Sequence, residues 1–290
     1  MRKPVRKAVF PVAGLGTRFL PVTKSIPKEM LPIVDKPIIQ YAVEEAVKAG
    51  INEIVFVTHP GKSSIEEHFR KAEDLEHELA TKNRQQLLAS INSLLERGLS
   101  WKSVIQHEPL GLGHAVLCAK DIVGNEPFAV ILPDDLIDDN DRGCLQQMVA
   151  VYERFQSAVI AVENIPATET GSYGIVETST IESKISQLES IVEKPHPDIA
   201  PSTLAVVGRY ILPSVIFEML EKTTKGAGGE IQLTDAIAML IENQQVLAYE
   251  FEGSRYDCGT KLGYLKANIA YGMKDTEIGN DFLEFIMSLK

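Results

Sequence analysis

The chain has 290 residues, 44% of them hydrophobic, and a formal net charge of −11. Its length suits one or two domains, and its acidity disfavours binding to nucleic acid or to anionic lipid. No apolar run approaches the roughly 18 residues needed to cross a bilayer, so we expect no membrane association. The three cysteines form no C-x-x-C pair, which disfavours a disulfide scaffold or zinc site and favours a reducing, cytoplasmic location.

The first half of the chain alternates apolar runs with amphipathic stretches. A first helix is expected between Asp35 and Gly50. Asp35 would cap its N-terminus, Pro37 would lie in its first turn and Gly50 would end it. The segment 63–97 is polar and predicts two helices or one helix with a break. Strands are expected at 7–14, 51–59, 103–109, 127–135 and 158–164, and the other helices at 113–123 and 144–156.

The pattern changes after residue 165. Strands at 172–178, 185–195 and 202–212 follow one another with little helix between them, and then come helix 228–243, strand 246–253, helix 260–272 and a closing amphipathic helix 275–290. We therefore predict an α/β fold with a Rossmann-like, mostly parallel central sheet flanked by helices and an antiparallel excursion. We expect one continuous domain over 1–290, with the excursion at about 165–212 and a C-terminal helical segment at about 260–290.

The stretch from Phe10 to Pro37, "FPVAGLGTRFLPVTKSIPKEMLPIVDKP", raises the question of what its loop holds. It is not the dinucleotide fingerprint G-x-G-x-x-G, because Phe19 stands where the third glycine is needed. "GKS" at Gly61–Ser63 is not a Walker loop either, because Phe56 stands where its first glycine is needed.

What remains is a strand followed by G-x-G-T-R and a proline-rich segment. Gly14 and Gly16 allow backbone amides to approach a phosphate closely, while Arg18 adds a planar donor fork and Lys28 a point charge. Ligands of open α/β sheets lie beyond the carboxyl ends of the strands, where this loop begins. The alternative is a tight turn with solvated basic residues.

Two acids stand near predicted strand ends. Asp134 ends the buried strand of "VILPDD", and Asp257 in "RYDCGT" comes just after another strand. At one crevice, these carboxylates would share an octahedral Mg²⁺ whose other ligands are phosphate oxygens and water. Helix capping is the alternative role for both acids.

Several motifs in order give the chain a strong resemblance to a known family. "AGLGTRFLPVTKSIPKEMLPIVDKPIIQY", "HEPLGLGHAV", "ILPDD", "GSYGIVE", "IVEKP", "VVGRYIL", "GGEIQLTDAI" and "RYDCGTKLGYL" resemble the signature of sugar-1-phosphate nucleotidylyltransferases. The wording of "PKEMLPIVDKP" is most similar to the bacterial UTP–glucose-1-phosphate uridylyltransferases, also called UDP-glucose pyrophosphorylases. The likeness runs from about residue 6 to 272.

The resemblance implies a nucleotide-diphospho-sugar transferase fold and a Mg²⁺-dependent reaction of UTP with glucose 1-phosphate that gives UDP-glucose and pyrophosphate. It also implies a homodimer or homotetramer. Because the attacking phosphate is already an anion at neutral pH, a general base would add little. The larger task is to hold two anions together, so cations and a metal are expected rather than a catalytic triad.

The resemblance also assigns roles to residues. Asp134 and Asp257 match the metal-binding acids, whereas Asp135 stands where an apolar residue is expected, so which neighbouring acid faces the metal is left open. The catalytic cations are Arg18, Lys28 and Lys194. The substrate-binding residues are Ala13, Gly14, Gly16, Thr17, Glu29, Gln106, Gly111 and Gly113 for the nucleotide, and Gly174, Glu193 and Val207 for the sugar.

Three other functions are compatible with parts of the sequence. A catalytically silent relative would bind sugar nucleotides and regulate a partner, but the intact motif residues disfavour it. A thymidylyltransferase of the same family differs in its substrate by one methyl group, worth only about 1–3 kcal/mol in a pocket. A nicotinamide dehydrogenase fits the α/β pattern but lacks the third glycine.

Overall fold

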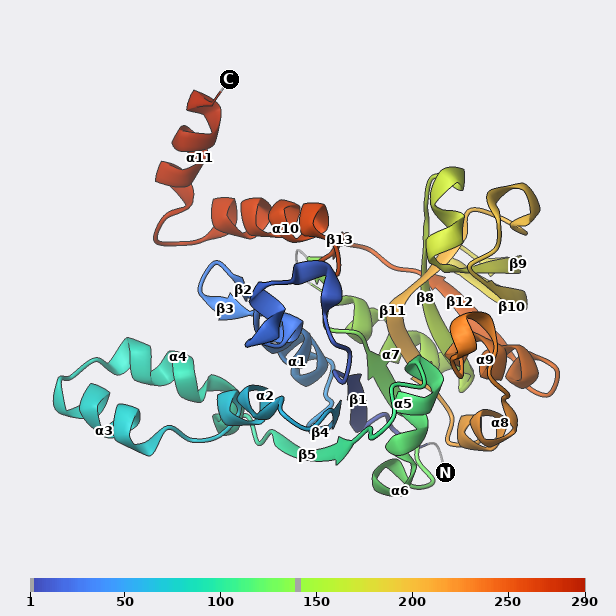
Figure 1. The fold of residues 1–290 in the computed structure, drawn as a ribbon, viewed down its shortest axis with the longest axis horizontal. Coiled ribbons are helices and arrows are strands. Elements are labelled where there is room, and N and C mark those ends of the chain that lie inside the picture. Colours follow the sequence, from blue (N-terminus) through green and yellow to red (C-terminus); the bar gives the residue numbers. More distant parts are fainter. Residues whose placement is uncertain (1–2, 139–141, 290) are drawn as a thin grey trace.

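The computed structural model describes residues 3–138 and 142–289. A nine-stranded sheet forms the centre of the fold (Figure 1). Its strands are β1 (Lys7–Pro11), β4 (Glu53–Thr58), β5 (Ser100–Ile105), β6 (Phe128–Ile131), β8 (Ala158–Asn164), β9 (Gly174–Glu182), β10 (Ile185–Glu193), β11 (Leu204–Leu212) and β12 (Val246–Glu250). Their order is β5-β4-β1-β6-β11-β8-β12-β10-β9. Two ribbons accompany the sheet: β2 (Pro32–Ile33) with β3 (Lys36–Pro37), and β7 (Asp135–Asp138) with β13 (Ser254–Asp257).

The sheet contains the predicted parallel part but is mixed, since four of the neighbouring strand pairs in its order are parallel and four are antiparallel. β1 pairs in parallel with β4 and β6, β4 with β5, and β8 with β12. β11 runs antiparallel to β6 and β8, and β10 runs antiparallel to β12 and β9. The antiparallel excursion is therefore built from β9, β10 and β11, which carry the sugar-side motifs.

Helices cover both faces of this sheet. The helices of the described residues are α1 (Ile38–Lys48), α2 (Ser63–His68), α3 (Glu73–Thr81), α4 (Gln85–Glu96), α5 (Leu112–Cys118), α6 (Lys120–Val123), α7 (Cys144–Phe155), α8 (Ile216–Lys222), α9 (Leu233–Ile241), α10 (Lys261–Lys274) and α11 (Gly279–Ser288). Ala8 and Phe10 of β1 join the core formed with α1 and α7, whereas Val9 joins the core formed with α5, α8 and α9. Successive strand residues point to opposite faces, so a strand buried on both sides is apolar throughout.

Several local expectations were wrong. Asp35 lies in the turn between β2 and β3, and Pro37 itself is the N-cap residue of α1, with no side-chain cap. The segment 63–97 forms three helices rather than one or two. Helix α8 and the β7–β13 ribbon were not predicted, because the former is short and the latter forms only where two distant segments meet.

Helix α10 lies against the body beside β2 and β13, and helix α11 projects away from the body (Figure 1). The two helices contact each other through Phe282 and Gly272. A Cβ added to Gly272 would lie only 2.9 Å from the Phe282 ring. The last residue of the predicted closing helix, Lys290, lies outside the described residues. None of the described helices combines the length and the apolar character that spanning a membrane requires.

Candidate active site

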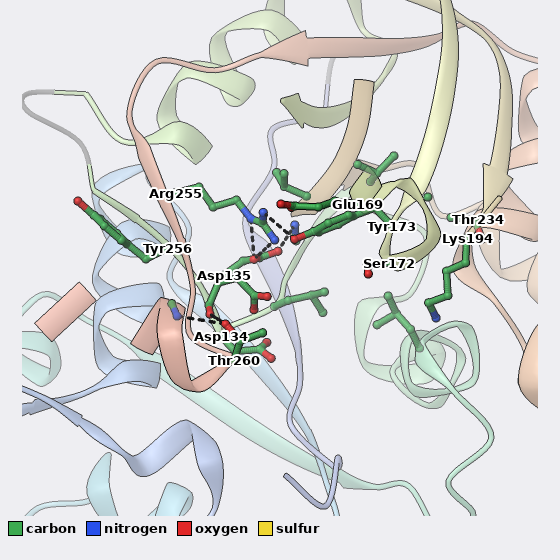
Figure 2. A pocket seen from close by; sticks show the side chains of 18 of the residues that line it. Asp134, Asp135, Glu169, Ser172, Tyr173, Lys194, Thr234, Arg255, Tyr256 and Thr260 are labelled. Carbon is green, nitrogen blue, oxygen red and sulfur yellow. Dashed lines mark hydrogen bonds and ion pairs between the residues drawn. The ribbon is translucent and has the colours of Figure 1, made fainter. Parts of the chain in front are cut away.

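A cavity of about 640 Å³ opens beyond the carboxyl ends of the strands (Figure 2). Its walls come from the β6–β7 turn, the antiparallel strands, the β13 end and the start of α10. Ligands of open α/β sheets bind at this edge. The predicted site residues that line the cavity are Arg18, Asp134, Gly174, Glu193, Lys194, Val207 and Asp257.

The two predicted metal-binding acids meet at one end of the cavity. Asp134 lies in the turn between β6 and β7, and Asp257 is the last residue of β13, which pairs with β7. A Cβ added to Gly259 would stand 2.9 Å from Oδ2 of Asp134 and 2.9 Å from Oδ1 of Asp257. The two oxygens are therefore no more than twice that distance apart, although 123 positions separate the residues in the sequence.

Cations surround this acidic pair. Lys28 Nζ lies 2.5 Å from Asp134 Oδ2, and Arg18 donates to the Gly259 carbonyl at 3.5 Å. Burial alone would raise the pKa of Asp134, but the Lys28 ammonium, a backbone hydrogen bond and the Arg18 charge together hold that pKa below its ordinary value. Burial and the neighbouring Asp135 carboxylate raise the pKa of Asp257. Lys28, which the sequence assigned to phosphate, is thus paired with Asp134.

Asp135 points into a different network. Its Oδ2 accepts from the Gly208 amide at 2.7 Å, and its Oδ1 accepts from Arg255 Nε at 2.7 Å. Arg255 also pairs with Glu163 at 2.6 Å and lies over the Tyr173 ring, as Figure 2 shows for the cluster around Asp135. Because both oxygens of Asp135 are bonded to protein groups, Asp134 is the acid available beside Asp257.

The opposite end of the cavity carries the sugar-side residues, with Lys194 and Thr234 across from Asp134 in Figure 2. Glu193 Oε2 accepts from the Thr234 hydroxyl at 3.0 Å, and Glu193 Oε1 lies 3.1 Å from Lys194 Nζ. Gly174 faces Glu193 across the β9–β10 ladder, and a Cβ there would stand 2.9 Å from the Thr234 methyl. Lys194 has φ +47°, a sparsely populated conformation for a residue with a side chain.

The nucleotide-side residues lie around the neighbouring strand ends rather than in the cavity lining. Gln106 is buried after β5, and its Nε2 donates to the Gly111 carbonyl at 3.2 Å and contacts His114 Nδ1 at 3.0 Å. Gly113 was expected to contact the nucleotide, but its amide is not available for this because it donates to the Ile231 carbonyl at 2.9 Å. A Cβ on Gly111 or Gly113 would collide with segment 230–232, so close packing requires both glycines.

The loop after β1 contains Ala13, Gly14, Gly16 and Thr17. Gly16 has φ +64°, and a Cβ there would lie 3.2 Å from the Lys28 Cβ. Glu29 is 1% exposed, and its Oε2 pairs with Lys62 Nζ at 3.1 Å. Burial raises the pKa of Glu29. Glu29 therefore forms a salt bridge through one carboxylate oxygen, and its other oxygen is unpaired among the described residues.

Three residues at the site were missed by sequence reasoning: Lys62, Thr234 and Arg255. Thr234 follows Glu230 and Gln232 in "GGEIQLTD", a motif that carried the resemblance, but a threonine before an apolar helix is usually a cap. Arg255 lies two residues before Asp257 in β13, so the two side chains share one face of this strand. No pattern indicated Lys62, since only the fold brings it to the loop after β1.

The fold and the site define a class. The nucleotidyl transferase family model matches residues 7–273, and the chain belongs to this family. No group of three or more His, Cys, Asp and Glu side chains able to hold a metal occurs in the described ranges.

More specific similarities follow. The UTP–glucose-1-phosphate uridylyltransferases of Bacillus subtilis and Escherichia coli are each 48% identical, over 99% of this chain and 98% and 97% of theirs. A UTP-bound UGPase from Acinetobacter baumannii is 50% identical, with a TM-score of 0.91 over 99% of this chain and all of that one. A UDP-glucose pyrophosphorylase complexed with UDP-glucose is 44% identical, with a TM-score of 0.86 over 93% of this chain and all of that one.

Proposed function

We propose that this protein transfers the uridylyl group of UTP to glucose 1-phosphate and releases UDP-glucose and pyrophosphate. The similarity to uridylyltransferases over nearly the full length supports this reaction. The observation that carries the proposal is the convergence of Asp134 and Asp257 at one end of a cavity whose other end holds Glu193 and Lys194. Acids for a metal and groups for a sugar phosphate thus face one space.

The paired carboxylates of Asp134 and Asp257 fit Mg²⁺, which favours oxygen ligands and keeps several positions for water and substrate phosphates. Gly259 matters for this fit, because a Cβ there would crowd both carboxylate oxygens at 2.9 Å. When bound, Mg²⁺ would neutralise charge on the triphosphate and polarise its phosphoryl oxygens. Asp135 takes no part, since Gly208 and Arg255 occupy its carboxylate.

The chemistry is an in-line displacement. A phosphate oxygen of glucose 1-phosphate attacks the α-phosphorus of UTP, and the bond to the pyrophosphate oxygen breaks. The task of the protein is to bring two anions together, and such positioning contributes roughly 7–11 kcal/mol in favourable cases. We assign Arg18 and Lys28 to the triphosphate and the departing pyrophosphate, and Lys194 to the phosphate of the sugar.

The sugar is recognised by Glu193. The Thr234 hydroxyl fixes one of its oxygens, so the carboxylate keeps its orientation while accepting hydrogen bonds from sugar hydroxyls. Gly174 leaves room beside it, and the Val207 backbone completes this wall of the cavity. A sugar that lacks the matching hydroxyls would lose its hydrogen bonds to this carboxylate and would therefore be disfavoured.

The nucleoside lies against the strand ends beside the loop after β1. Gln106 already uses its amide nitrogen, so its Oε1 is the atom left to accept from the N–H of uracil. Glu29 Oε1 is a buried acceptor without a partner in the described part of the chain, and a hydroxyl of the nucleoside would satisfy it. Ala13, Gly14, Gly16, Thr17 and Gly111 contribute backbone contacts.

A pyrophosphate-release assay tests the proposal. We expect turnover with UTP, glucose 1-phosphate and Mg²⁺, no turnover after chelation, and kcat/KM for UTP above that for dTTP. Isotope-labelled glucose 1-phosphate should appear in UDP-glucose. Tight binding of UDP-glucose without any turnover would favour the silent, regulatory relative, and a preference for dTTP would favour the thymidylyltransferase.

We further propose a homodimer or homotetramer in the cytoplasm. Helix α10 packs one face on the body and exposes a second apolar stripe formed by Leu262, Leu265, Ile269 and Met273, spaced three or four residues apart. A second copy of the chain would cover this stripe. Light scattering after size exclusion should give a multiple of 32.0 kDa, and Leu265→Glu should shift the mass toward the monomer. An unchanged mass would exclude this face.

A further inference from the structure

Lys62 belongs to the "GKS" segment that does not form a Walker loop, yet its ammonium is fully engaged. The residue follows β4 and is the N-cap residue of α2. Its Nζ lies 2.6 Å from the Val12 carbonyl, 2.5 Å from the Gly14 carbonyl and 3.1 Å from Glu29 Oε2. Its side chain is only 11% exposed. These contacts join the ends of β1 and β4 and the segment around Glu29 at one point.

An ammonium group has three donors, and Lys62 directs all three at oxygens of the protein. It therefore has no donor left for a phosphate, unlike the lysine of a Walker loop. The nearby Glu29 carboxylate offsets its charge, which makes burial of the ammonium tolerable. The contacts to the Val12 and Gly14 carbonyls are charge-assisted hydrogen bonds, which are about twice as strong as neutral ones.

These bonds fix the direction of the loop amides. In a trans peptide the C=O and the following N–H point in opposite directions. Because the carbonyls of Val12 and Gly14 point at Lys62, the N–H groups of Ala13 and Leu15 point away from it. Within the described ranges, none of the amides of residues 13–16 donates a hydrogen bond to the protein. The loop thus presents unpaired donors on the side opposite Lys62.

We propose that Lys62 is a positioning residue for the nucleoside triphosphate: its ammonium holds the Val12 and Gly14 carbonyls so that the loop amides face UTP. This inference rests on the proposed uridylyl transfer. Lys62 acts through the loop and touches neither substrate. Loss of its charge-assisted bonds lets the loop amides rotate, so binding of UTP weakens while the distant sugar end of the cavity is unaffected.

Two variants test the role of Lys62. Lys62→Met keeps most of the apolar stem and removes the donors. Lys62→Arg keeps the charge beside Glu29, but its planar fork does not match two carbonyls that converge on one nitrogen. For both we expect KM for UTP, and Kd for UTP from calorimetry, to rise about tenfold or more, as the loss of charged hydrogen bonds implies. KM for glucose 1-phosphate should stay within about twofold of the parent value. The matched control is Lys71→Met, the same change at an exposed lysine nearby.

A residue with a merely structural role would give another result. It would lower the melting temperature and the active fraction, and it would leave both KM values unchanged or raise them equally. Either pattern, in a variant that folds, would overturn the proposal. If Lys62→Met does not fold, Lys62→Arg decides. Failure of the proposed function is distinguishable, because the parent protein would then release no pyrophosphate, whereas failure of this inference leaves the parent active and shows no selective rise of KM for UTP in the variants.

Discussion

Removing the carboxylate of Glu45 should destabilise the protein strongly. Glu45 on α1 and Arg209 on β11 form an ion pair at 2.7 Å, and the Arg209 side chain has no exposed surface. Arg209 also donates to the Leu132 carbonyl at 2.9 Å, two residues before Asp134. Glu45 in turn accepts from the Leu145 amide of α7 at 2.9 Å. One carboxylate therefore ties a strand of the sheet to two helices.

The magnitude follows from what the substitution leaves behind. Glu45→Ala leaves the buried Arg209 guanidinium without its carboxylate partner and without access to water. Breaking a buried ion pair in this way costs about 3–5 kcal/mol. The loss of the Leu145 bond leaves a buried amide unpaired and works in the same direction. Folded proteins have only about 5–15 kcal/mol of net stability. We therefore expect the melting temperature to fall by roughly 6–20 °C, at about 2–4 °C per kcal/mol.

Urea denaturation followed by circular dichroism measures the change, with thermal melting as a second readout. The control is Glu78→Ala, which removes the partner of Lys82 in an exposed i,i+4 pair and should cost no more than about 0.5 kcal/mol. The double variant with Glu45→Leu and Arg209→Met should regain much of the loss, because it leaves no unpaired charge. A loss below about 1 kcal/mol for Glu45→Ala would refute the argument that the buried guanidinium depends on this carboxylate.

Three further substitutions test the assignments at the cavity. Asp257→Asn should lower kcat by orders of magnitude with little change in UTP affinity; near-parental turnover would remove this residue from the metal site. Glu193→Ala should raise KM for glucose 1-phosphate and leave nucleotide binding nearly intact, and a defect confined to UTP would contradict its role. Gly259→Ala should raise the Mg²⁺ concentration needed for activity, since the new Cβ would crowd Asp134 and Asp257, whereas Gly171→Ala, with its nearest neighbour at 3.8 Å, should not. Equal magnesium dependence of the two alanine variants would argue against a metal between these acids.

The sequence by itself determined the architecture. Apolar runs of four to nine residues, alternating with 3.6-residue periodicity, predict a parallel sheet covered on both faces, and the observed order β5-β4-β1-β6 has this form. The change of pattern after residue 165 predicts the antiparallel strands. These features can be read from short stretches of sequence, because burial of an element on one or both faces sets the spacing of its apolar residues. The division into a single domain with a sugar-side subregion stays a prediction.

Motif resemblance supplied most of the site, including Asp134, Asp257, Glu193 and Lys194. Their convergence could not be read from spacing, because the β7–β13 ribbon that brings Asp257 beside Asp134 joins segments that no local pattern pairs. For a related reason, the sequence left open which of Asp134 and Asp135 faces the metal, and it did not show that the Gly113 amide is occupied. Whether a carboxylate or an amide is free depends on partners such as Arg255 and Ile231, far away in the sequence.

Only the tertiary structure decided which polar groups are already satisfied and which are left for a ligand. Lys62 shows this most clearly, since protein oxygens take up every donor of its ammonium. Hydrogen bonds depend on distances of about 3 Å between groups that the fold brings together. A linear pattern records which faces are buried, but it does not record which donor meets which acceptor.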